Sequence, residues 1–189
     1  MIEESNVVLC NGDIFDNSSS WDIMCHQVNC KGGFGRGIAG TIATKYPHIK
    51  DFYVQFVNFY TGGNNHNSQI LAQDSSVLLG KVQILQIFDP KFDEKPNRFI
   101  ANLFGQDDYG ADPEKLYTNY EALGNSLERL SGVLGGLCGE PNKKLTIAFP
   151  YKMSCGLANG DWNIVLGMIN EFAKSSPYIE CVKIFKLGG

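Results

Sequence analysis

Apolar positions along the chain follow two alternating spacings. Short runs rich in Val, Ile, Leu and Phe, bounded by Gly, Pro or Asp, are typical of buried strands. Such runs occupy residues 6–9, 22–28, 77–88 (as one or two strands), 98–104, 145–149 and 179–185. Between them, apolar residues recur every three or four positions, which predicts helices. These helical segments occupy residues 37–46, 48–60, a long stretch from 112–113 to about 132–136, and 161–174.

The alternation of strands and helices predicts an α/β fold with three layers. A mixed, mainly parallel central sheet would carry helices on both of its faces. No internal repeat and no shift in composition marks a boundary, so residues 1–189 are expected to form one domain. In such folds ligands bind at the carboxyl ends of the strands, so the segments that follow the strands are where functional residues are expected.

Composition and charge exclude several classes of protein. A hydrophobic fraction of 43% and an aromatic fraction of 12% over 189 residues indicate a globular chain with a buried core. The net charge of −4 comes from 16 Lys and Arg against 20 Asp and Glu, so no basic surface for nucleic acid is expected. A small anion held by backbone amides does not require a basic protein.

Several further signals concern the cellular compartment. No run reaches the roughly 18 consecutive apolar residues of a membrane span, and residues 1–5 lack the features of a signal peptide. The six cysteines include no C-x-x-C pair, which indicates reduced thiols in a cytoplasmic protein. A zinc site from Cys25, His26 and Cys30 would have an unusual spacing, so neither a metal nor a cofactor is expected.

Two glycine-rich segments follow predicted strands and lead into predicted helices. Glycine loop 1 (residues 29–39) carries four glycines in six positions, at 32, 33, 35 and 37, and glycine loop 2 (residues 149–162) carries two more. Glycines let backbone N–H groups approach a ligand, and a following helix N-terminus favours phosphate. Loop 1 fits neither of the two commonest nucleotide-binding patterns. Two such cradles indicate a ligand with a diphosphate between two sugars.

At this level of detail the chain resembles the macrodomain family of ADP-ribose-binding proteins, over about residues 8–185. Three motifs carry the resemblance in order: Gly12-Asp13-Ile14, Asn29 through Ala39, and Ser154-Cys155-Gly156-Leu157. Residues 26–32, 79–83 and 102–106 resemble small stand-alone members most. Those members include phosphatases of ADP-ribose 1''-phosphate, whose proposed catalytic histidine matches His26.

The resemblance implies a set of binding residues. Asp13 would accept a hydrogen bond from the adenine amino group near the Ile14 amide, although it could instead cap a turn. Phe185 would pack on the adenine or else belong to the core, and Asn29 would hold the distal ribose or else bond its own loop. The remaining residues would line the distal ribose and the diphosphate: Gly33, Gly35, Gly37, Ile38, Ser154, Cys155, Gly156 and Leu157.

Two residues are candidates for catalysis beside Asn29. A neutral His26 at the mouth of the distal-ribose loop would act as nucleophile or general acid/base on a phosphate, unless it is a hydrogen-bonded core residue. Asp161 is expected to cap the helix that follows it; the alternative is that it assists His26 or positions a water.

The resemblance therefore implies a metal-independent phosphatase that converts ADP-ribose 1''-phosphate to ADP-ribose and phosphate. Two alternatives remain open: a hydrolase that removes ADP-ribose from a modified macromolecule, and a reader that binds ADP-ribose without catalysis. One hydrolase branch of the family uses a lysine and an aspartate. Gln106 and Ala158 stand near those positions here, which argues against that mechanism.

Overall fold

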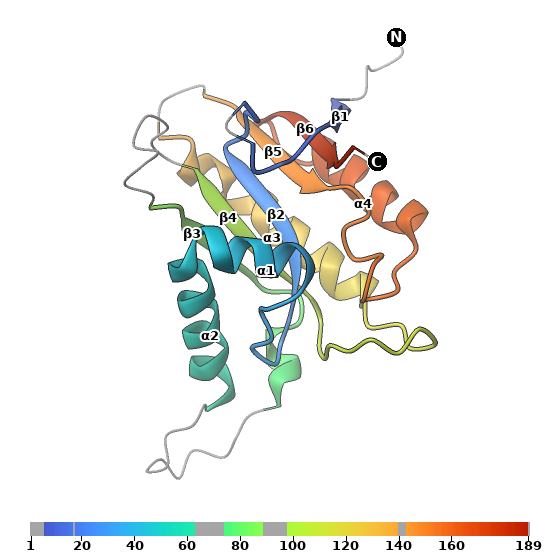
Figure 1. Cartoon of the computed structure of the whole chain (residues 1–189). Helices are drawn as coiled ribbons and strands as arrows, with labels where there is room; N and C mark the ends of the chain where they lie inside the picture. The colour runs from blue at the N-terminus through green and yellow to red at the C-terminus, as the bar shows by residue number, and fades with distance from the viewer. Residues whose placement is uncertain (1–5, 17, 63–73, 89–97, 140–142, 189) are drawn as a thin grey trace.

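The computed structural model describes residues 6–16, 18–62, 74–88, 98–139 and 143–188 (Figure 1). The strands are β1 (Val7–Asn11), β2 (Ile23–Asn29), β3 (Val82–Gln86), β4 (Phe99–Gln106), β5 (Leu145–Pro150) and β6 (Ile179–Lys186). The helices are α1 (Gly37–Lys45), α2 (Pro47–Thr61), α3 (Tyr120–Leu137) and α4 (Trp162–Lys174), with a 3-10 turn η1 (Ser75–Leu78).

The strands form one sheet in the order β1-β6-β5-β2-β4-β3. Every neighbouring pair is parallel except β3 with β4, which confirms the mixed, mainly parallel sheet. The central strands are nearly continuous apolar runs because helices cover both of their faces. The carboxyl ends of the five parallel strands therefore meet at one edge, and both glycine loops leave the sheet there.

Alternate side chains of β2 feed two separate cores. Ile23 and Cys25 pack on the face covered by α3 and α4, whereas Met24 and Val28 pack on the face covered by α1 and α2 (Figure 1). This division follows from the period of two along a strand. It confirms the three-layer arrangement, and it decides which β2 side chains can reach the ligand edge.

Two predicted elements differ from the structure. The long helix begins at Tyr120, not at 112–113, because Asn119 caps it by accepting a hydrogen bond from Ala122 N. The preceding segment instead bonds to glycine loop 2, since Tyr117 N and Thr118 N both donate to Ala158 O. The run at 77–88 contains the end of η1 and then one strand, β3.

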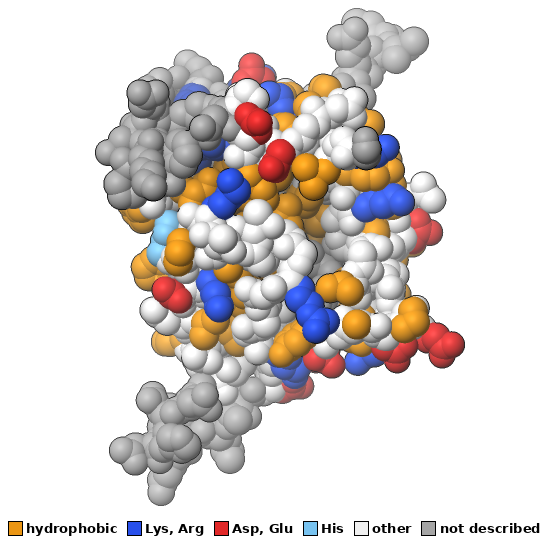
Figure 2. Space-filling view, in the orientation of Figure 1, with side chains coloured by type: hydrophobic (Ala, Val, Ile, Leu, Met, Phe, Trp, Pro, Cys, Tyr) orange, Lys and Arg blue, Asp and Glu red, His pale blue; other side chains and the backbone are white. Residues whose placement is uncertain are grey.

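Within the described residues no helix is long and apolar enough to cross a bilayer. On the face seen in Figure 2, the Lys and Arg side chains are scattered among hydrophobic and neutral ones and form no single basic patch.

A buried chain of polar groups crosses the sheet at His26. The His26 ring is fully buried, and its Nε2 lies 2.6 Å from Asn102 Oδ1. Asn102 in turn donates to Gln83 Oε1, and Gln83 donates to the backbone oxygen of Phe52 on α2. Since Asn102 Oδ1 is the acceptor, neutral His26 carries its proton on Nε2. Desolvation lowers the pKa of His26 from 6.5 to about 4, although the bond to Asn102 opposes this shift.

We expect this histidine to make the fold sensitive to acid. Between pH 6.5 and about 4 this histidine is protonated in the unfolded chain but stays neutral in the folded protein. The free energy of unfolding therefore falls as the pH falls, by roughly 3 kcal/mol across this window. H26Q keeps a donor for Asn102 and does not titrate. Urea unfolding across this window should give a flatter pH dependence for H26Q, and the matched variant H48Q shows what another histidine contributes. An unchanged slope in H26Q contradicts the buried neutral ring.

Candidate functional site

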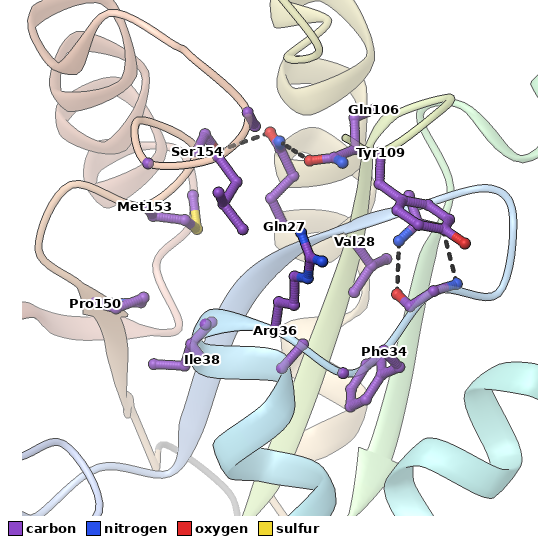
Figure 3. A pocket seen from close by; sticks show the side chains of 18 of the residues that line it. Gln27, Val28, Phe34, Arg36, Ile38, Gln106, Tyr109, Pro150, Met153 and Ser154 are labelled. Atoms are coloured by element: carbon purple, nitrogen blue, oxygen red, sulfur yellow. Dashed lines mark hydrogen bonds between the residues drawn. The ribbon is translucent and has the colours of Figure 1, made fainter. Parts of the chain in front are cut away.

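A cleft of about 790 Å³ opens at the carboxyl edge of the sheet. Glycine loop 1 and the start of α1 form one wall, and glycine loop 2 forms the other (Figure 3). The end of β4 and the segment after it, with Gln106 and Tyr109, close one end. The two loops that the sequence singles out therefore face each other across a single cavity.

Glycine loop 1 is held in shape by its own side chains. Asn29 Oδ1 accepts hydrogen bonds from Lys31 N and Gly33 N, while Asn29 Nδ2 donates to Gly33 O. The buried Tyr53 hydroxyl on α2 donates to the Asn29 backbone oxygen at 2.7 Å. Phe34 is 3% exposed and packs on the rings of Tyr53 and His26, so it anchors the loop to the core.

The loop leads directly into α1. Gly37 has φ +55, a conformation that L side chains rarely adopt, and the first residues of α1 line the cleft. Amides in the first turn of a helix lack partners within the helix and carry the positive end of its dipole. The wall formed by Gly37, Ile38 and Ala39 is therefore suited to an anion.

Glycine loop 2 holds three residues other than glycine in the left-handed region: Lys152 at φ 56, Ser154 at φ 68 and Asn159 at φ 54. Gly160 N donates to Ser154 O at 2.8 Å. A Cβ at Gly160 would lie 2.7 Å from that same oxygen, so this close approach requires glycine. Left-handed backbone at several neighbouring residues is costly and persists where surrounding contacts impose it.

A hydrogen-bond network ties the two loops together. Gln27 Oε1 accepts from the Ser154 hydroxyl, and Gln27 Nε2 donates to Gln106 Oε1, both at 2.7 Å (Figure 3). Thr118 Oγ1 donates to Ser154 O at 3.0 Å. Gln27 therefore links the strand before loop 1 to loop 2 and to the end of β4, which sets the separation of the two walls.

Comparison with known proteins adds to this geometry. No family model matches the chain. Two curated relatives are each named ADP-ribose 1''-phosphate phosphatase. The relative from Meyerozyma guilliermondii is 24% identical over 159 residues, 80% of this chain and 85% of its own length. The relative from Debaryomyces hansenii is 26% identical over 180 residues, 85% of this chain and 90% of its own length.

Solved structures show the same architecture. The macrodomain protein from Streptomyces coelicolor has a TM-score of 0.65 at 22% identity and covers 96% of this chain and 99% of its own. The macrodomain of Mycobacterium tuberculosis DarG has a TM-score of 0.66 at 19% identity, covering 95% and 96%. The chain has the macrodomain fold. Thermosipho africanus DarTG, solved in complex with ADP-ribose, has a TM-score of 0.66 at 15% identity and covers 97% of this chain and 42% of its own.

Most of the predicted site residues lie around the cleft. Those that line it are Asn29, Gly33, Gly35, Gly37, Ile38, Ser154, Gly156 and Leu157. The Cys155 side chain instead donates its thiol to Met153 O at 3.1 Å. Burial first, and then the nearby Asp161 carboxylate, raise the pKa of Cys155 to about 11, so its thiol stays protonated near neutral pH.

The residues predicted to hold adenine lie beyond the cleft lining, at the ends of β1 and β6. Asp13 is exposed and accepts a hydrogen bond from Phe15 N, as a turn residue does. Ile14 and Phe185 are 4% and 9% exposed and belong to the core under α1 and α2. Phe185 O accepts from Tyr151 N, so this region adjoins loop 2.

Two of the residues predicted to be catalytic lie outside the cleft lining. His26 does not line the cleft, because position 26 points into the core beneath Phe34 and the ring is fully buried. Asp161 caps α4 by accepting from Asn163 N at 2.8 Å, as expected, and does not line the cleft either. Neither His26 nor Asp161 is among the described residues that line the cleft.

Sequence reasoning overlooked several residues that line the cleft: Gln27, Arg36, Gln106, Tyr109, Tyr151 and Lys152. Arg36 carried a signal, since it is a cation between two glycines at a helix start. Gln27 carried none, because its role depends on Ser154, 127 positions away in the sequence. No Asp, Glu or His is among the described residues that line this cleft.

We expect G105A to break the network at Gln27. A Cβ at Gly105 would lie 2.7 Å from Gln27 Oε1, which must then leave Ser154. Loss of these bonds should lower the free energy of unfolding by about 1–3 kcal/mol and speed amide exchange in loop 2. G132A is the matched control: its Cβ meets nothing within 4 Å, and Ala should add about 0.5–1 kcal/mol in this exposed helical position. Wild-type exchange in loop 2 of G105A would show that Gln27 does not secure it.

Proposed function

We propose that this macrodomain binds ADP-ribose and removes the phosphate from ADP-ribose 1''-phosphate. The observation that carries the proposal is the cleft between two amide-rich loops, one of which ends in a helix N-terminus. Such walls suit a diphosphate, and a volume of about 790 Å³ is within the range of small-molecule sites. The names of the two curated relatives, which match along most of both chains, support the reaction.

The order of the strands supports one orientation of the ligand. The adenosine would lie toward β1 and β6, with Asp13, Ile14 and Phe185 around the adenine. The diphosphate would bridge the start of α1 and Gly156 of loop 2. The distal ribose would then lie over the ends of β2 and β4, where Asn29 shapes the wall. The 1'' position of this ribose would face Gln27 and Gln106.

The chemistry follows from what lines the cleft. Phosphoryl transfer passes through a loose transition state that needs positioning and charge stabilisation more than a strong base. A water oxygen bonds to phosphorus and the bond from phosphorus to the 1'' oxygen breaks. One proton of the water goes to the departing 1'' oxygen, and the other stays on the inorganic phosphate. The products are ADP-ribose and inorganic phosphate. Since no carboxylate or imidazole lines the described cleft, its donor set does not suit a divalent cation, and we propose that the reaction needs none.

The described cysteines are free thiols, three of them buried. The free thiols support a cytoplasmic protein, and the acidic net charge supports a small-molecule ligand over a nucleic acid. The single six-stranded sheet supports one domain.

The decisive experiment is incubation of the purified protein with ADP-ribose 1''-phosphate, with and without a chelator. We expect equal amounts of phosphate and ADP-ribose, unaffected by the chelator. Parallel samples with ADP-ribosylated protein and nucleic acid test the hydrolase alternative. Binding of ADP-ribose without turnover of any of these substrates would identify a reader and end the phosphatase proposal.

We expect G156V to abolish ligand binding without harming the fold. A Cβ at Gly156 meets nothing within 4 Å because it faces open space, and a branched side chain there would occupy the diphosphate cradle. Calorimetric affinity for ADP-ribose should fall at least about 100-fold, while the unfolding midpoint stays within about 2 °C. G167V on α4 has an equally open Cβ and should bind like wild type. Retained affinity in G156V would remove loop 2 from the site.

A further inference from the structure

The cleft is positively charged although the protein is acidic. The net charge of the chain is −4, yet the charged residues that line the cleft are Arg36 on loop 1 and Lys152 on loop 2. No described Asp or Glu lines it. Fixed charge of one sign inside a concave site is effective because the low-dielectric walls focus its field. The two cations therefore mark where the anionic groups of a ligand would lie.

Their surroundings separate the roles of these two cations. Lys152 Nζ lies 5.8 Å from the centroid of the Tyr151 ring, and Lys186 Nζ lies 5.2 Å from the same ring. Tyr151 is joined to β6 through Phe185 O, so this pair belongs to the end of the cleft where the adenosine would lie. Lys152 thus has an aromatic partner next to β6.

Arg36 has no such partner. Within the described part of the chain, no ion pair and no side-chain hydrogen bond holds its guanidinium. By contrast, the guanidinium of Arg98 packs 3.4 Å from the centre of the Trp21 ring. The Arg36 side chain extends into the cleft on the side of Gln27 and Val28 (Figure 3).

The backbone of Arg36 is nonetheless firmly placed. It is the extended residue that precedes α1, with φ −127 and ψ 157, and its oxygen accepts the first helical bond from Gly40 N. Two residues earlier, the buried Phe34 fixes the loop to the core. The backbone of Arg36 is thus fixed, while its exposed side chain makes no contact among the described residues that stabilises the fold and is available to bind a ligand.

We propose that the Arg36 guanidinium binds the terminal 1''-phosphate and is the catalytic residue that stabilises its transfer. This proposal deepens the proposed function and rests on it. A guanidinium offers a planar pair of N–H donors that match two phosphoryl oxygens, whereas the loop amides serve the diphosphate that substrate and product share. Arg36 would thus distinguish ADP-ribose 1''-phosphate from ADP-ribose.

The step is the hydrolysis given above, with Arg36 in a defined role. As the bond from phosphorus to the 1'' oxygen lengthens, negative charge spreads over the phosphoryl oxygens and the leaving oxygen. The guanidinium stays protonated and donates to the phosphoryl oxygens throughout. Water supplies the attacking oxygen and the proton that the 1'' oxygen receives, so Arg36 is unchanged at the end.

The test compares R36Q and R36K with wild type. For R36Q we expect kcat/KM for phosphate release to fall at least about 100-fold, mostly in kcat, while calorimetric affinity for ADP-ribose stays within about threefold. R36K keeps the positive charge but lacks the planar pair of N–H donors, so it should recover part of the rate, to about a tenth of wild type. R129Q on the exposed surface of α3 is the matched control and should behave as wild type.

Each other result overturns the assignment. If R36Q loses ADP-ribose affinity as much as kcat/KM, Arg36 holds the diphosphate; if it turns over normally, Arg36 does not touch the phosphate. An equal loss in R129Q would make the effect one of net charge. If wild type releases no phosphate, the proposed phosphatase function fails, and binding affinities then test the role of Arg36. Wild type should bind ADP-ribose 1''-phosphate at least about tenfold more tightly than ADP-ribose, and R36Q should show no such preference.

Discussion

The separation of the two glycine loops depends on one side chain amide. Gln27 uses its oxygen to hold Ser154 of loop 2 and its nitrogen to hold Gln106 at the end of β4. Ser154 at φ 68 lies in backbone that is unfavourable by itself, so loop 2 needs such external contacts to keep its shape. Gly105 gives Gln27 the room it needs. The cleft is thus formed before a ligand arrives, and binding need not pay to order its walls.

Glycine loop 1 is supported by its own side chains and by the core that it covers. Asn29 closes the loop on itself, Tyr53 ties Asn29 to α2, and Phe34 seals the core over His26. Every one of these groups is occupied by the protein itself. Asn29 and Phe34 also line the cleft, but the Asn29 amide is hydrogen-bonded within the loop, so the groups of this wall that are available to an anion are the backbone amides around Gly37 and the side chain of Arg36.

Particular residues show how far the sequence reached. Apolar periodicity and the two glycine loops predicted the sheet, its layers and the cleft, because these follow from local spacing and from the rule that parallel strands end at one edge. The position of His26 in the motif did not indicate that its side chain is buried. Side chains 24, 26 and 28 share the face under α1 and α2, while side chain 27 points to the other face. The predicted start of α3 was wrong because the segment before the helix donates backbone hydrogen bonds to Ala158 O instead of continuing the helix.

The composition of the cleft bears on catalysis itself. In the proposed reaction the diphosphate is unchanged between the substrate and the transition state, so amides that bind it stabilise both states equally and do not raise kcat. Only a group in contact with the phosphoryl oxygens can favour the transition state. With His26 and Asp161 committed to the fold, Arg36 is the charged side chain of the described cleft that has no structural partner. A guanidinium stabilises charge without transferring a proton, so this role is compatible with a cleft whose described lining holds no Asp, Glu or His.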